Sequence, residues 1–112
     1  DIYPTLVELC GLEQPKQTLD GQSLLPIIKN AQFKRSEPSI TYYKHGSVSV
    51  RTVNYRYIRY YDGSEELYEE LTDPLELNNL AYKQEYREVI DSIGHWIPAK
   101  FAPTVTKIGV EN

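Results

Sequence analysis

A chain of 112 residues with a formal net charge of −4 is long enough for one modest hydrophobic core. Its content of 40% hydrophobic and 25% charged residues is ordinary for a globular protein and excludes a disordered profile. The acidic balance disfavours nucleic acid as a partner, no apolar run is long enough to span a membrane, and a single cysteine excludes an internal disulfide and a cysteine-rich zinc site.

Two short helices are predicted in the first 38 residues. The first covers Asp1–Leu12, with Asp1 as its N-cap and Gly11 at its end. Its apolar residues fall on one helical face, namely Ile2, Leu6, Leu9 and Cys10. On that face Cys10 is expected to be a small buried hydrophobe rather than a nucleophile. The segment 23–28 predicts one or two further helical turns.

Four strands are predicted next, over Ser39–Lys44, Ser47–Val53, Tyr55–Tyr61 and Glu66–Leu71. Val48, Val50 and Thr52 alternate with polar neighbours, which is typical of a strand with one buried face. Asn54 and the Asp62–Ser64 segment supply turn residues between strands. Connections this short predict an antiparallel meander.

The segment 83–97 predicts an amphipathic helix that Pro98 ends. Its apolar stripe consists of Tyr86, Val89, Ile90, Ile93, Trp96 and Ile97. A face of the meander is the obvious place to bury this stripe. We therefore expect an α+β fold in which a four-stranded antiparallel sheet packs against a C-terminal amphipathic helix, with short N-terminal helices. Residues 39–98 would form this subdomain, and 99–112 a tail that is loose or bound to a partner.

Tyrosine is the unusual residue of this sequence, with 10 tyrosines against 2 phenylalanines. Seven of them lie in the strand-rich middle: Tyr42, Tyr43, Tyr55, Tyr57, Tyr60, Tyr61 and Tyr68. Packing on a pleated, half-buried surface is the favoured interpretation. The alternative is a platform on which sugars or bases stack.

Four glutamates near the last strand raise the hypothesis of a catalytic carboxylate pair: Glu65, Glu66, Glu69 and Glu70. Their spacing spreads them over both faces of a strand. A solvated edge is therefore the favoured interpretation.

Four segments, in this order, carry a resemblance to a known family. They are DIYPTLVELCGL (1–12), LDGQSLLP (19–26), VRT with YRYI (50–58), and ELYEEL with DP and NNL (66–80). Together they resemble the C-terminal end of a sulfatase of the alkaline-phosphatase-like superfamily. The run from Ser49 to Tyr57 is most similar to the iduronate-2-sulfatase-like branch.

This resemblance implies a parent enzyme that hydrolyses sulfate esters, for example the iduronate 2-sulfate of a sulfated sugar. Sulfatases use a formylglycine made from Cys or Ser in a Cys/Ser-X-Pro-X-Arg motif, and a divalent cation, usually calcium. Cys10 is followed by Gly11-Leu12-Glu13-Gln14, which departs from that motif. No catalytic residue and no metal ligand is therefore carried over, and neither cofactor is expected within these residues.

The resemblance also implies how the chain is organised and where it works. Residues 1–38 would end the large sulfatase domain, and 39–98 would pack against the N-terminal catalytic domain of the same chain, where they help to shape the substrate cleft. Sulfatases of this kind are exported to the periplasm, the cell exterior or lysosomes. A stand-alone carbohydrate-binding module and an interaction domain without a ligand are the alternatives.

Three residues are candidates for substrate binding. Lys44 and His45 lie in the turn between the first two predicted strands, where they could offer positive charge to a sulfate or a uronate. A solvated turn is the favoured alternative. Arg51, the third candidate, lies within a strand. It is more readily explained as a structural residue paired with a carboxylate or with carbonyls at the interface with the catalytic domain.

Overall fold

The computed structural model describes residues 1–44 and 46–102. The chain forms two compact units, of which the first runs from Asp1 to Ser36 and the second begins at Glu37. Most of the predicted tail, residues 103–112, lies outside the described residues.

The first unit holds α1 (Ile2–Leu9) and α2 (Leu25–Lys29). Asp1 occupies the N-cap position of α1, but its side chain makes no capping hydrogen bond. One of its carboxylate oxygens instead accepts a hydrogen bond of 2.9 Å from the amide of Gln22, and both pair with the guanidinium of Arg35. The predicted cap is wrong because these two donors hold the carboxylate against the segments around α2.

The apolar face predicted for α1 is exposed. Relative exposures are 74% for Ile2, 48% for Leu6 and 57% for Leu9, and Cys10 is exposed as well. The residues that α1 buries are Thr5 and Val7. The prediction of a buried Cys10 is therefore wrong, because the chain around α2 lies on the Thr5 side of the helix, where the Thr5 hydroxyl accepts a hydrogen bond of 2.8 Å from the amide of Leu24.

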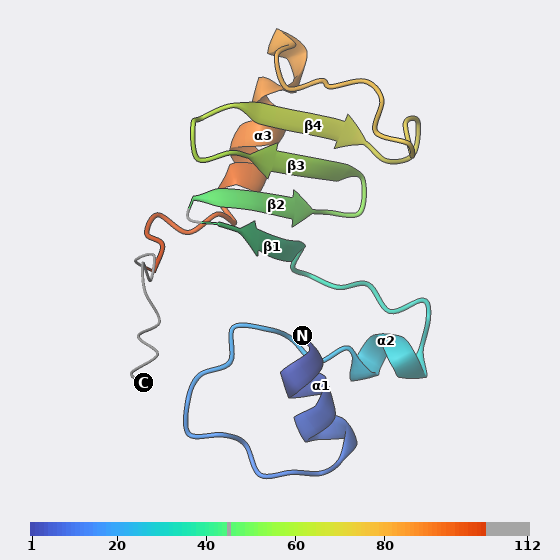
Figure 1. Cartoon of the computed structure of the whole chain (residues 1–112). Helices are drawn as coiled ribbons and strands as arrows, with labels where there is room; N and C mark the ends of the chain where they lie inside the picture. Colours follow the sequence, from blue (N-terminus) through green and yellow to red (C-terminus); the bar gives the residue numbers. More distant parts are fainter. Residues whose placement is uncertain (45, 103–112) are drawn as a thin grey trace, which may run out of the picture. The chain divides into compact units, whose positions relative to one another are not determined.

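The second unit is a four-stranded antiparallel sheet in the order β1-β2-β3-β4, with a helix over one face (Figure 1). Its elements are β1 (Ser39–Tyr43), β2 (Ser47–Arg51), β3 (Tyr55–Arg59), β4 (Glu65–Glu69), the short 3₁₀ helix η1 (Gln84–Tyr86) and α3 (Arg87–Gly94). The predicted fold class, with its meander and C-terminal helix, is confirmed.

The core of this unit lies between the sheet and α3. Val50 lies opposite Tyr57 in the register, and Tyr57 lies opposite Leu67. These three side chains are 0%, 2% and 0% exposed. Ile90 and Ile93 of α3 pack against them in one cluster. Burial of each such side chain contributes about 1.5–3 kcal/mol, which makes this cluster the main source of stability.

Most predicted elements differ from the structure by a few residues at their ends, and two of them, β2 and the last helix, end early for a local reason. β2 ends at Arg51 because the amide and hydroxyl of Thr52 both bond to Tyr55 in a tight turn. The last helix ends at Gly94 rather than at Ile97. Its chain continues in 3₁₀-type turns, in which the amide of Ile97 donates to the carbonyl of Gly94 over 3.0 Å.

Candidate functional site

The structure separates two of the three candidate substrate-binding residues. Lys44 lies in the turn that precedes β2, and Arg51 is the last residue of β2. Because a strand rises about 3.3 Å per residue, the two are at opposite ends of it. His45 lies outside the described residues. One sulfate group is too small to contact both Lys44 and Arg51.

Lys44 is exposed and has an unusual backbone conformation. Its φ angle is +53°, in the left-handed region that non-glycine residues rarely adopt. Its ammonium nitrogen lies 5.4 Å from the centre of the Tyr43 ring, and Tyr43 is 66% exposed. Tyr61 is 78% exposed and lies beside Gly46 of the same turn, which places a cation and two open aromatic rings at this end of the sheet.

Arg51 belongs to a network of ion pairs on the face of the sheet opposite α3. Its Nε lies 3.2 Å from a carboxylate oxygen of Glu70, and its Nη1 donates to the backbone carbonyls of Thr52 and Val53. This matches the interpretation of Arg51 as a structural residue paired with a carboxylate and carbonyls. Its guanidinium is thus largely committed to the protein itself.

Glu70 holds a second guanidinium as well. Arg56 lies directly opposite Arg51 in the register of β2 and β3, and its Nε is 3.6 Å from the same oxygen of Glu70. Arg56 also pairs with Glu76. The two positive and two negative charges cancel, so the network offers little net attraction to an anion.

The other three glutamates lie on β4 and accept hydrogen bonds from tyrosines, an arginine and a threonine. Tyr57 donates a hydrogen bond of 2.6 Å to Glu65, and Arg87 of α3 binds Glu65 through two bonds of 3.0 Å. Glu66 accepts bonds from the hydroxyls of Tyr60 and Tyr68, and Glu69 accepts from Tyr55 and Thr72. The expected solvated edge is therefore wrong.

These contacts shift the pKa values of the groups involved. The hydrogen bonds from Arg87, ahead of that from Tyr57, lower the pKa of Glu65. Burial, followed by the bond to Glu66, raises the pKa of Tyr68 to about 12. Burial and the bond to Glu65 raise the pKa of Tyr57 far above its ordinary value. Glu65 is thus held ionised and the phenols of Tyr57 and Tyr68 are held neutral, which is the opposite of an acid poised to transfer a proton at neutral pH.

The cross-strand pairs between β3 and β4 could have been predicted from the sequence, although no single glutamate indicates them. Folding the chain about the Asp62-Gly63 turn sets Arg59 opposite Glu65 and Tyr55 opposite Glu69, as observed. Cross-strand neighbours of opposite character stabilise a hairpin. The glutamates of β4 therefore stabilise its pairing with β3.

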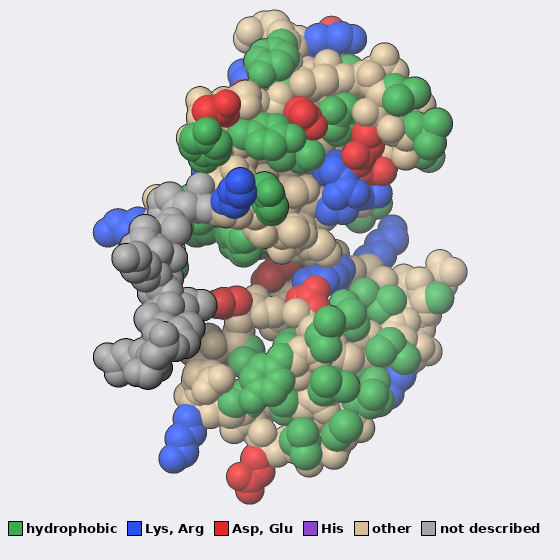
Figure 2. Space-filling model, viewed as in Figure 1, with side chains coloured by type: hydrophobic (Ala, Val, Ile, Leu, Met, Phe, Trp, Pro, Cys, Tyr) green, Lys and Arg blue, Asp and Glu red, His purple; other side chains and the backbone are tan. Residues whose placement is uncertain are grey.

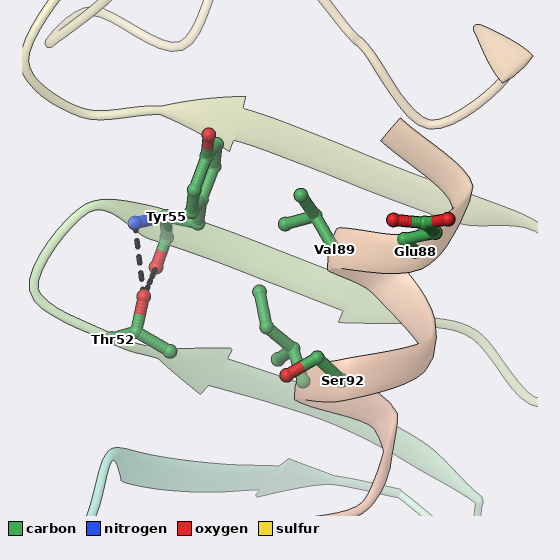
Figure 3. A pocket seen from close by; sticks show the side chains of 6 residues that line it. Thr52, Tyr55, Glu88, Val89 and Ser92 are labelled. Atoms are coloured by element: carbon green, nitrogen blue, oxygen red, sulfur yellow. Dashed lines mark hydrogen bonds between the residues drawn. The ribbon is translucent and has the colours of Figure 1, made fainter. Parts of the chain in front are cut away.

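A cavity of about 390 Å³ lies between α3 and the β2–β3 turn. It is lined by Thr52, Tyr55, Glu88, Val89, Ser92 and Ile93 (Figure 3). The Thr52 hydroxyl already accepts from the Tyr55 amide and donates to the Tyr55 carbonyl. Because Glu88 supplies negative charge and no cation lines the cavity, it is a poor site for a sulfate. None of the three candidate residues contributes to it.

Possible metal ligands among residues 1–44 and 46–102 do not form a cluster. No group of three or more His, Cys, Asp and Glu side chains among them is placed to hold a metal ion. Asp73 lies near Glu76 and Asn78 in sequence, and its carboxylate accepts hydrogen bonds from the backbone amides of Leu77 and Asn78.

In the part of the chain that the structure describes, no helix is long and apolar enough to cross a membrane.

Comparison with known proteins identifies the family. A family model described as "N-sulphoglucosamine sulphohydrolase, C-terminal" matches residues 1–100. A sulfatase of Formosa agariphila is 33% identical over 97 residues, which is 87% of this chain and 19% of the relative. A Delta 4,5-hexuronate-2-O-sulfatase of Bacteroides thetaiotaomicron is 32% identical over 99 residues, 80% of this chain and 20% of the relative.

Solved structures agree with these sequence relatives. A 2-O GAG sulfatase superposes with a TM-score of 0.64 and 30% identity, over 82% of this chain and 22% of that one. A protein in complex with its substrate D-glucosamine-2-N,6-O-disulfate gives a TM-score of 0.63 and 25% identity, over 85% of this chain and 22% of that one. This chain thus spans about a fifth of the length of the curated relatives it matches. It belongs to the C-terminal domain family of N-sulphoglucosamine sulphohydrolase, among the sulfatases of the alkaline-phosphatase-like fold.

Proposed function

We propose that this chain is the C-terminal part of an enzyme that hydrolyses sulfate esters, and that the reacting groups lie in a preceding catalytic domain. The match of residues 1–100 to a sulfatase C-terminal family carries this proposal. Two further observations support it: the described residues hold no cluster of metal ligands, and the chain spans about a fifth of its relatives. The calcium ion and the formylglycine of sulfatases would then be held by that domain.

The exposed face of α1 supports contact with such a domain. Figure 2 shows hydrophobic side chains gathered on the unit formed by residues 1–36. The exposed apolar residues of this unit are Ile2, Tyr3, Leu6, Leu9, Leu12, Ile28 and Phe33. A patch of this kind is unusual on a free surface and typical of an interface. On our proposal it packs against the catalytic domain.

For the substrate we propose the 2-sulfate of a uronate in a sulfated sugar, such as iduronate 2-sulfate. Support comes from two relatives whose names specify 2-O sulfatases, one of hexuronate and one of GAG. A structure bound to D-glucosamine-2-N,6-O-disulfate stands at a similar TM-score, so the competing substrate is an N-sulfated glucosamine. That Lys44, His45 and Arg51 contact this substrate stays a prediction. Export from the cytoplasm belongs to the same proposal.

Kinetics of the complete protein test the choice of substrate. We would compare kcat/KM for a disaccharide with a 2-O-sulfated uronate against one with an N-sulfated glucosamine. The proposal expects the first to be preferred by at least about tenfold, a difference of about 1.4 kcal/mol in transition-state binding. A preference for the N-sulfated sugar would contradict the substrate and leave the sulfatase assignment intact. Export is tested by fractionating the cells that produce the complete protein and measuring how much of it lies outside the cytoplasm.

One observation favours the alternative of a stand-alone carbohydrate-binding module. Tyr43 and Tyr61 are exposed beside Lys44, and open aromatic rings next to a cation suit a sulfated sugar. Titration of the 112-residue chain with heparin fragments separates the two functions. Binding that Tyr61→Ala abolishes and Tyr3→Ala preserves would support the module, since Tyr3 is an exposed tyrosine of the other unit.

A further inference from the structure

The cavity between α3 and the β2–β3 turn has an apolar wall and a polar rim on its helix side. Val89 and Ile93 lie four residues apart and form the apolar row, and Glu88 and Ser92 form the neighbouring polar row. Its volume of about 390 Å³ lies within the range of about 300–1,000 Å³ that is typical of ligand pockets. The helix side therefore offers both packing surface and polar groups to one ligand.

The sheet side of the cavity offers an aromatic ring rather than free polar groups. Figure 3 shows the Thr52 hydroxyl bonded to the backbone of Tyr55. The Tyr55 hydroxyl donates a hydrogen bond of 3.4 Å to Glu69, so the ring is what this residue contributes to the wall. A wall of this kind suits an apolar or a flat, delocalised group.

The carboxylate of Glu88 carries a charge that is unmatched among residues 1–44 and 46–102. It takes part in none of the ion pairs of this part of the chain. Arg87, its neighbour in sequence, is committed to Glu65 and Asp91. The hydroxyl of Ser92 lies one helical turn further on and adds a second group that can accept a hydrogen bond. The polar row is therefore suited to a cation.

The ligand that matches this cavity has an apolar stem and a cationic head. An arginine side chain has this form, because an aliphatic stem carries a planar guanidinium with several N–H donors. The stem would lie along Val89 and Ile93, and the head would meet Glu88 and Ser92. Lysine fits less well, since its ammonium is strongly hydrated, whereas a guanidinium loses water more readily and stacks on a ring such as that of Tyr55.

The source of such an arginine lies outside this chain. No arginine among the described residues lines the cavity, and residues 103–112 contain none. The chain covers 19% and 20% of the two sequence relatives named above, so most of such a protein is a further part. An adjoining domain is a natural source of a fixed cation, because interfaces between domains are rich in polar contacts.

We propose that the cavity beside Glu88 is a docking site for an arginine side chain of the preceding catalytic domain. This inference rests on the proposed function, which supplies that domain. The aliphatic part of the arginine packs on Val89 and Ile93, and its guanidinium pairs with Glu88 across from Tyr55. The contact is separate from the apolar contact proposed for α1, since it is made by α3 and depends on charge.

Chemical labelling of a thiol at position 92 tests this proposal. Ser92→Cys is introduced into the 112-residue chain and into the complete protein, both with Cys10→Ser, and peptide mass spectrometry follows its reaction with iodoacetamide. We expect position 92 to react at least about tenfold more slowly in the complete protein, because the arginine covers it. The control is Asn78→Cys, at an exposed residue of the loop after β4, which should react equally fast in both proteins.

The charge of Glu88 is tested in the same assay. With Glu88→Lys, position 92 should react equally fast in the complete protein and in the chain alone, because a positive charge there repels the guanidinium. Glu85→Lys makes the same change of charge on η1, outside the cavity, and should leave the tenfold difference in place. Protection that survives Glu88→Lys would overturn the proposal, since the cover would then not depend on charge.

Equal rates of the Ser92→Cys variant in the two proteins would overturn the proposal as well. So would protection in the chain alone that grows with protein concentration, since a second copy would then cover the cavity. Sulfate release by the same complete protein separates this inference from the proposed function. Equal rates together with sulfate release would contradict the docking site alone. Protection without sulfate release would support the docking site and contradict the hydrolysis of sulfate esters.

Discussion

Arg51 and Arg56 lie directly opposite each other on β2 and β3, and the carboxylate of Glu70 binds both. Like charges in this position repel each other, and the shared carboxylate of Glu70 offsets this repulsion. The side chain of Glu70 is only 14% exposed, against 34% for Arg51. Charge pairing therefore stabilises this part of the sheet face opposite α3.

Replacing Glu70 by Gln should destabilise the chain by about 2 kcal/mol, because it leaves two guanidinium groups facing each other without a counter-charge. The measurement is the urea concentration at half-unfolding. Glu37→Gln, at an exposed position, is the control and should change stability by less than about 0.5 kcal/mol. Equal midpoints for the two variants would show that the network contributes nothing.

Leu67→Ala should cost about 3 kcal/mol, because Leu67 is fully buried at the centre of the core cluster. Leu71→Ala makes the same chemical change two residues beyond the end of β4, at a side chain that is 87% exposed. Its effect should stay below about 0.5 kcal/mol. A loss of similar size in both variants would place the core elsewhere.

Stability should fall at acid pH through Glu65, whose pKa is lowered in the folded chain by its bonds to Arg87 and Tyr57. A carboxylate with a lowered folded-state pKa stabilises the fold above its unfolded pKa of about 4.3, and this contribution disappears as the pH falls through the folded-state pKa. Urea unfolding across this range is the measurement. In the Glu65→Gln variant the free energy of unfolding should depend less on pH. An unchanged dependence would show that Glu65 does not cause the loss of stability at acid pH.

Tyr68 should stay protonated until about pH 12, because burial and the bond to Glu66 raise its pKa. A neutral phenol with a raised pKa stabilises the fold below its unfolded pKa of about 10, and this contribution is lost as the pH rises through the folded-state value. NMR titration of the labelled ring follows it directly. Glu66→Gln should bring the midpoint down, and a midpoint that stays in place would leave burial as the whole cause.

The exposed face of α1 should matter only in the complete protein. Leu6→Glu in the 112-residue chain should change stability by less than about 0.5 kcal/mol, since Leu6 is 48% exposed there. In the complete protein the same change should cost about 3 kcal/mol, because it would bury a charge at the proposed interface. Leu75→Glu, at a side chain that is 76% exposed, is the control. Equal effects of Leu6→Glu in both proteins would argue against that interface.

The sheet was predictable from sequence because each strand has its own local signal. The alternation around Val48 and Val50 and the turn at Asp62-Gly63 fix the faces and the hairpins, and the structure confirms both. The apolar stripe that contains Ile90 and Ile93 correctly predicted where the helix packs. Local patterns of this kind do not depend on the rest of the fold.

The errors arose where an outcome depends on residues far away in sequence. Cys10 is on an apolar face, but no pattern within α1 says whether anything covers that face. The glutamates of β4 look solvated one by one, but the register with β3 and the packing of α3 bring them partners such as Tyr57 and Arg87. The substrate contacts proposed for Lys44 and Arg51 depend on the proposed catalytic domain, and no pattern within this chain describes that domain.

Release of sulfate by the purified 112-residue chain, with and without added calcium, tests the central claim most directly. The substrate would be a disaccharide with a 2-O-sulfated uronate, and the complete protein would be assayed beside it. We predict that the complete protein releases sulfate and that the chain alone stays at the level of the buffer, since on our proposal the reacting groups lie in the preceding catalytic domain. Sulfate released by the chain alone would contradict the account.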